Sequence, residues 1–231
     1  MPESRIRATL PSRIPPAERP TLVLYEDPLS PWCLVAERRI TAALQELSEA
    51  FGPLHHEPFP LRVEARAITR TERQRLARAV RRASREPEAS GVTPDLWLSP
   101  DPPLSSIPPL AALAAARQQG KDREQMLRGA LREAALFRGV NVSRRDVLYE
   151  LAERAGLDVE RFAGTLSAPQ TERRIRERFE DALDRGVEVA PALVIGEEWL
   201  VAGPRSSDEY RHILLRYARA KLALPPDHTL H

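Results

Sequence analysis

The stretch PLSPWCLVAERR, residues 28–39, follows the short apolar run LVLY of residues 22–25. The apolar run predicts a buried strand, and the Asp-Pro pair between the two stretches predicts a turn. Pro31 suits the first turn of a helix, and the apolar residues that follow it recur on one helical face. The sequence therefore predicts a strand, a tight corner and a helix, with Ser30 just before the helix and Cys33 in its first turn.

The rest of the chain divides into three parts. The helix after Pro31 is expected to reach about residue 50, and residues 55–61 form a second extended piece, so the chain opens β-α-β with parallel strands. Capping residues and glycines then mark a series of helices up to about residue 186. Two short apolar runs, 191–195 and 199–201, predict a β-hairpin, and a last helix starts at Ser206 or Ser207.

Several segments, taken in this order, resemble the DsbA family of thioredoxin-like proteins, especially its cytoplasmic FrnE-like branch. They also resemble 2-hydroxychromene-2-carboxylate isomerases and kappa-class glutathione transferases, which are related to that branch. The matching segments are Asp27–Cys33, Glu57–Leu61, Ala134–Phe137, Asp146–Leu148, Ala155–Asp158 and Val189–Gly196.

The resemblance implies an α/β thioredoxin-like fold with an all-helical insertion. The expected parts are a flexible arm (1–20), a thioredoxin-like domain (21–61 and 187–222), a helical insertion whose last helix packs on the sheet (62–186) and a tail (223–231).

The resemblance also implies a site at the corner. Pro191 would be the family's cis-proline, and it would leave the backbone of Ala190 free to pair with an extended peptide or a thiol ligand. The disulfide-exchanging members carry Cys-Pro-Trp-Cys at the corner, where this chain has Ser30, Pro31, Trp32 and Cys33. A serine hydroxyl cannot join a disulfide, so this chain alone cannot run a two-cysteine cycle. It is then a thiol-linked oxidoreductase homologue with an altered motif.

Three interpretations of that motif remain open. In the first, Ser30 hydrogen-bonds the thiolate of glutathione or another small thiol at the helix N-terminus, as in the transferases and isomerases that the chain resembles. In the second, Cys33 acts alone as a monothiol, although a cysteine facing the core is expected to react slowly. In the third, the groove binds a peptide or partner without catalysis. Trp32, which lies beside the site, would form one wall of a groove for a thiol ligand.

Composition limits the other classes of function. The single cysteine excludes an internal disulfide and a cysteine-based zinc site, and the five histidines suggest no converging ligand set, so no metal is expected. No secretory signal or membrane span is evident, and the expected compartment is the cytoplasm. The arginine-rich run 62–85 lacks aromatic residues and predicts a solvated helix rather than a nucleic-acid surface. Whether the chain is a monomer or a homodimer stays open.

Two acidic residues, Glu26 and Asp27, flank the corner. In thioredoxin-like proteins an acid at this place can relay protons. For Asp27, an exposed aspartate in a turn is the simpler expectation.

Overall fold

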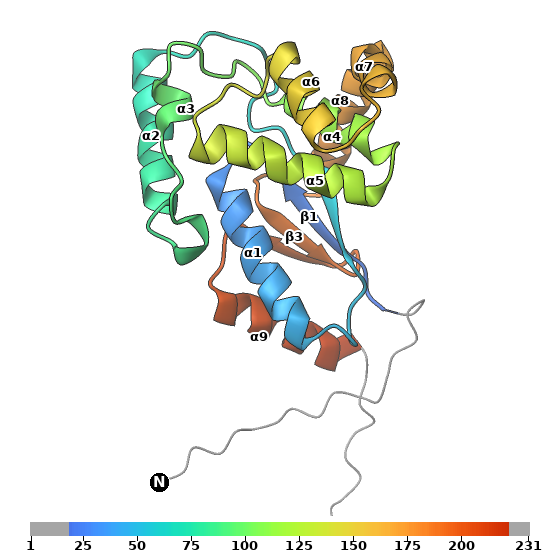
Figure 1. Ribbon diagram of the computed structural model, residues 1–231. Helices are drawn as coiled ribbons and strands as arrows, with labels where there is room; N and C mark the ends of the chain where they lie inside the picture. Colours follow the sequence, from blue (N-terminus) through green and yellow to red (C-terminus); the bar gives the residue numbers. More distant parts are fainter. Residues whose placement is uncertain (1–18, 222–231) are drawn as a thin grey trace, which may run out of the picture.

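The computed structural model describes residues 19–221 (Figure 1). The expected tail and all but the last two residues of the expected arm lie outside this range. None of the helices within it is long and apolar enough to cross a lipid bilayer.

A four-stranded mixed sheet forms the base of the fold, in the order β2-β1-β3-β4. β1 pairs in parallel with β2, while β3 is antiparallel to both β1 and β4. The strands are β1 (Leu22–Glu26), β2 (Leu54–Pro58), β3 (Ala192–Ile195) and β4 (Trp199–Ala202). The β-α-β opening and the C-terminal hairpin are confirmed.

The turn of the hairpin depends on an unusual backbone conformation. Gly196 and Glu197 both have positive φ, at 57° and 64°. Two successive residues of this kind make a type I′ turn, whose twist matches that of the two strands it joins.

Helices make up most of the remaining chain. They are α1 (Pro31–Glu46), α2 (Arg70–Ala83), α3 (Asp95–Leu98), α4 (Ile107–Arg117), α5 (Lys121–Arg132), α6 (Arg145–Arg154), α7 (Val159–Ser167), α8 (Pro169–Asp184) and α9 (Ser207–Lys221). A 3₁₀ turn, Pro87–Ala89, follows α2, and a π-helical turn, Glu133–Phe137, continues α5. The predicted thioredoxin-like α/β fold, with helices between the second strand and the hairpin, is confirmed.

Two boundaries differ from the sequence prediction. α1 ends at Glu46 rather than near residue 50. β2 ends at Pro58 rather than at Leu61, because Pro58 pairs with Glu26, the last residue of β1, and the Leu61 N–H beyond it donates to the Asp27 carboxylate (2.8 Å).

The two faces of the sheet are covered by different helices. On one face, α1 and α9 pack over the strands through residues such as Leu24, Ile40 and Leu214. On the other face, the C-terminal half of α8 packs over β1 and β2, where the rings of Phe59 and Phe179 meet edge to face with centroids 4.9 Å apart.

The helices α4 to α8 gather at one end of the sheet, and α5 passes close to the C-terminal end of β1 (Figure 1). They share one apolar core with the first turns of α1, which contribute Leu34 and Val35. The corner after β1 is therefore enclosed between the sheet and the helices, and this arrangement creates the cavities described below.

Candidate functional site

The corner after β1 has the predicted geometry. Ser30 is the N-cap residue of α1, and its Oγ accepts a hydrogen bond from the Cys33 N–H at 3.3 Å. The Ser30 N–H in turn donates to the Asp27 carbonyl at 3.0 Å, which closes the turn. Ser30 therefore lies where the unpaired amides of the helix create a partial positive charge.

The prediction that Asp27 is an exposed turn residue is wrong, because its side chain is completely buried. Its carboxylate accepts hydrogen bonds from the N–H groups of Leu29 and Leu61, both at 2.8 Å. Burial raises the pKa of Asp27 above its ordinary value, and the hydrogen bonds from the Leu61 and Leu29 N–H groups oppose that rise. The side chain ties the corner to the segment after β2, a long-range contact that the local Asp-Pro pattern did not reveal.

Cys33 faces the core, as expected. Its exposed fraction is 0%, and burial raises the pKa of its thiol to about 12. At neutral pH this thiol is therefore almost entirely protonated. Because the thiolate is the reactive form of cysteine, the geometry disfavours a monothiol mechanism.

Native Cys33 is accordingly expected to stay unmodified when the folded protein is incubated with oxidised glutathione. The thiol has neither access to solvent nor an appreciable thiolate fraction. Intact-mass spectrometry checks this, with the same reaction in denaturant as the positive control, where one glutathione should add. Equal extents of modification in the native and denatured protein would contradict the expectation.

A cavity of about 450 Å³ opens beside the corner. Four of the six residues predicted for the site line it: Ser30, Pro31, Trp32 and Ala190. Cys33 and Pro191 are not among the lining residues. The structure therefore brings the helix N-terminus and the loop before β3 together around one space, as the resemblance implied.

The Ala190–Pro191 peptide bond is cis, in agreement with the resemblance. The Pro191 carbonyl accepts a hydrogen bond from the Gly203 N–H at 2.9 Å. The backbone of Ala190 makes no hydrogen bond to any other part of residues 19–221. Its polar groups are thus available to a ligand in the cavity.

Arginines of the run 62–85 form the far wall of this cavity, which the sequence did not reveal. Glu72 accepts from Arg62 (3.1 Å) and Arg66 (2.8 Å), so these two charges are compensated. Arg75 lines the same cavity, is exposed and has no ion pair within the described residues. The helical spacing of positions 72, 75, 76 and 79 on one face of α2 was the available signal. The spacing shows that these positions share a face of α2, but it does not show which part of the protein that face lies against.

Glu26, on the other side of the strand end, belongs to a buried ion-pair network. Its carboxylate pairs with Arg128 at 2.7 Å, with Arg132, and with His56 Nδ1 at 2.9 Å. Burial alone would raise the pKa of Glu26, but Arg132, His56 and Arg128 together hold it well below the ordinary value. Arg132 also pairs with Glu37, so α5 is joined to both β1 and α1.

The same network brings together ligand-type atoms that the sequence had not placed near one another. Atoms of Glu26, Glu37 and His56 lie within 4.8 Å of one another. Both carboxylates are already paired with guanidinium groups, and a cation here would also face the positive charges of Arg128 and Arg132. The donor set therefore fits an internal salt-bridge network better than a metal site.

The sequence matches the family model of the DSBA-like thioredoxin domain over residues 21–214. The chain belongs to this family. No curated protein matches the sequence.

Solved structures agree with the family assignment. A predicted protein disulfide isomerase from Nitrosomonas europaea is 18% identical, with a TM-score of 0.75 over 88% of this chain and 100% of the other. The cytosolic disulfide reductase DsbM from Pseudomonas aeruginosa, solved with glutathione, is 19% identical (TM-score 0.64, 86% and 99% covered). A 2-hydroxychromene-2-carboxylate isomerase is 18% identical (TM-score 0.58, 87% and 95% covered). At these identities the likeness establishes the fold of this family member, which is shared by a disulfide reductase and by two kinds of isomerase.

Proposed function

We propose that this protein binds glutathione or a small thiol of similar size beside Ser30 and activates its sulfur as a thiolate. The observation that carries the proposal is the hydrogen bonding of Ser30. Its Oγ accepts from the Cys33 N–H, which leaves its own O–H free to donate into the cavity. A donor at a helix N-terminus stabilises a thiolate by hydrogen bonding and by the partial charge of the helix.

The rest of the cavity suits such a ligand. Glutathione carries two carboxylates and an extended backbone. Arg75 offers an unpaired guanidinium, and Ala190 offers an unpaired backbone. The half-buried ring of Trp32 supplies an apolar wall.

The chemistry that follows is addition of the thiolate to an electrophilic carbon. The sulfur forms a bond to that carbon, and either a leaving group departs with its electron pair or the same bond breaks again after rearrangement. The first outcome is a transferase reaction and the second an isomerase reaction. Disulfide exchange by the protein's own sulfurs is disfavoured, because Ser30 replaces the attacking cysteine and Cys33 is buried. One similar structure, the cytosolic DsbM solved with glutathione, supports a small thiol as ligand and the cytoplasm as compartment.

Glutathione binding to the Ser30→Ala variant tests this proposal. A hydrogen bond to a charged group contributes about 1.5–3 kcal/mol, so affinity should fall by roughly 10- to 100-fold in a calorimetric titration. Ser167→Ala is the matched control, because Ser167 is exposed and lies outside the cavity, and its affinity should equal that of the wild type.

A second readout follows the ligand sulfur directly. Thiolate absorbance on titration with alkali should show a lowered pKa for bound glutathione in the wild type, and a smaller shift in Ser30→Ala. Cys33 adds no signal near neutral pH, since burial raises its pKa to about 12. Wild-type affinity in Ser30→Ala, or no binding of glutathione to either protein, would refute the proposal.

The free backbone of Ala190 favours one alternative, a peptide-binding protein without turnover. An extended peptide would pair with this backbone and lie along the cavity. Peptide binding that is unaffected by Ser30→Ala, together with absent glutathione binding, would favour this alternative.

A further inference from the structure

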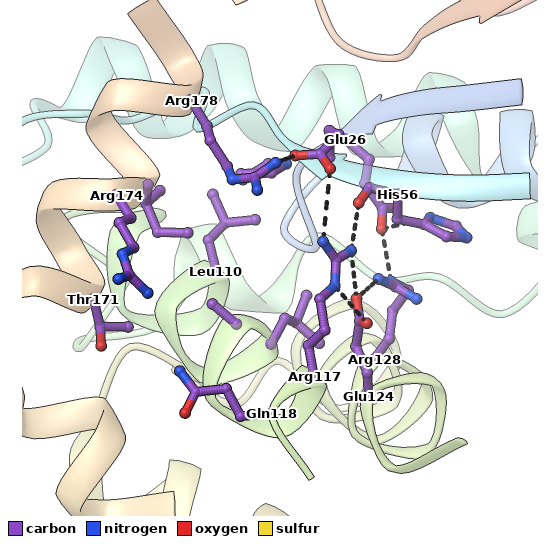
Figure 2. A pocket seen from close by; sticks show the side chains of 15 residues that line it. Glu26, His56, Leu110, Arg117, Gln118, Glu124, Arg128, Thr171, Arg174 and Arg178 are labelled. Carbon is purple, nitrogen blue, oxygen red and sulfur yellow. Dashed lines mark hydrogen bonds and ion pairs between the residues drawn. The ribbon is translucent and has the colours of Figure 1, made fainter. Parts of the chain in front are cut away.

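A second cavity, of about 230 Å³, lies on the other side of the strand ends (Figure 2). It is enclosed by the ends of β1 and β2 and by helices α4, α5 and α8. It shares no lining residue with the cavity beside Ser30. Neighbouring residues of the corner divide between the two, with Glu26 lining this cavity and Asp27 the other.

One side of this second cavity is electrically satisfied. Glu124 pairs with Arg117 (2.8 Å) and Arg128 (2.6 Å). Glu57 pairs with Arg117 (3.6 Å) and with Arg178. Figure 2 shows the pairs that Arg117 and Arg128 make with Glu124 on one side of the space, near Glu26 and His56, while Arg178 reaches across from α8.

Elsewhere on the wall, two exposed polar side chains have no partners within the described part of the chain. Arg174 extends from α8 toward the cavity, and Gln118 approaches from the end of α4 (Figure 2). Neither side chain has a hydrogen bond or ion pair to the rest of residues 19–221. Arg174 is thus a cation without an anionic partner in this range. The carboxylates that line the same cavity all pair with other cationic side chains.

Between the two sides lies an apolar surface. Leu110, Leu113 and Ile175 line it, and each is at most 6% exposed. Half-buried Pro58 and Ala114 extend it. Such a surface holds the hydrocarbon body of a ligand, while a few polar groups orient it.

We propose that this cavity binds a small organic monoanion, a carboxylate that carries a short aliphatic chain or a single ring. The carboxylate pairs with Arg174 and accepts a hydrogen bond from the Gln118 amide. The apolar body lies against Leu110, Leu113 and Ile175. The arginines at the far side are already paired with Glu57 and Glu124, so the ligand carboxylate is directed to Arg174 and the ligand binds in one orientation. One unpaired arginine matches one negative charge, which favours a monoanion over a phosphate dianion.

Calorimetric titration of the full chain with hexanoate, butyrate and hexanamide tests the proposal. Hexanoate should bind more tightly than butyrate, by about fourfold for each added methylene. Hexanamide, which keeps the chain but not the charge, should bind at least about tenfold more weakly than hexanoate.

Two variants locate the site. Arg174→Met should weaken hexanoate binding at least about tenfold while leaving hexanamide unchanged. Arg173→Met is the matched control: Arg173 is the exposed neighbour on α8, it does not line the cavity, and its loss changes the net charge identically. Circular dichroism spectra of both variants should match that of the wild type.

Four results would overturn the proposal. The first is that neither hexanoate nor butyrate binds at millimolar concentration, and the second is that hexanamide binds as tightly as hexanoate. Equal weakening in the two arginine variants would indicate nonspecific charge. Loss of hexanoate binding in Ser30→Ala would assign the ligand to the other cavity. Since the two cavities share no residues, failure of this proposal leaves the glutathione proposal untouched.

Discussion

Glu26→Gln is expected to destabilise the protein by about 3 kcal/mol or more, the largest effect among single side chains at the corner. The Glu26 carboxylate is 2% exposed and pairs with Arg128 and Arg132, which are also buried. Removing its charge leaves two guanidinium groups in a low-dielectric interior with one partner fewer. Denaturant unfolding measures the loss as a change in the free energy of unfolding.

The same substitution should change how stability depends on pH. The pKa of Glu26 is lowered from 4.5 in the folded protein, so its stabilising contribution is complete above about pH 4.5. The contribution is lost as the pH falls from there toward the lower folded-state pKa. The difference in unfolding free energy between wild type and Glu26→Gln should therefore shrink on acidification below about pH 4.5.

Glu150→Gln is the matched control for both measurements. Glu150 pairs with Arg154 on the surface, where both side chains are more than half exposed. Exposed pairs contribute up to about 1 kcal/mol, so this variant should remain close to the wild type. An equal loss in the two variants, or a difference that does not change with pH, would show that the Glu26 network does not stabilise the fold.

Ser30→Cys is expected to create a disulfide reductase, with a rate at least about a hundredfold above that of the wild type. The new thiol would lie at the N-cap of α1, where the helix end lowers its pKa, and Cys33 would lie three residues further on to resolve the mixed disulfide. Reduction of a model peptide disulfide, with dithiothreitol as electron donor, measures the gain.

The double variant Ser30→Cys with Cys33→Ala separates the two sulfurs. It keeps the attacking thiol but lacks the resolving one, so it should accumulate the mixed disulfide and turn over slowly. Rates that match those of the single variant would mean that Cys33 takes no part. A single variant that forms no internal disulfide on mild oxidation would show that the corner no longer supports the exchange geometry.

The local features of the corner were predictable because they depend on neighbours in the chain. A strand of apolar residues, an Asp-Pro turn and a proline in the first helical turn put Ser30 at the N-cap. Residue type also excluded one chemistry: a chain with a single cysteine cannot form an internal disulfide. The cis peptide bond before Pro191 was implied by family resemblance rather than by any local rule.

The burial of a side chain, by contrast, was predicted correctly only where the helical spacing of apolar residues indicates it. Cys33 falls on the apolar face of α1 and was placed in the core correctly. Asp27 was expected in solvent because an aspartate before a proline is typical of exposed turns. Its carboxylate instead binds the N–H of Leu61, 34 residues away, and no local pattern encodes that contact.

The amino-acid sequence by itself determined the order of strands and helices, the hydroxyl at the helix N-terminus and the loss of the dithiol cycle. These depend on residue types and on spacings of a few positions. Tertiary structure alone decided which distant charges meet: Arg132 reaches Glu26 across 106 positions, and Arg174 is left without an anion at a second cavity. The energy of an ion pair depends on distance and on the surrounding dielectric, and both exist only once the helices have packed on the sheet.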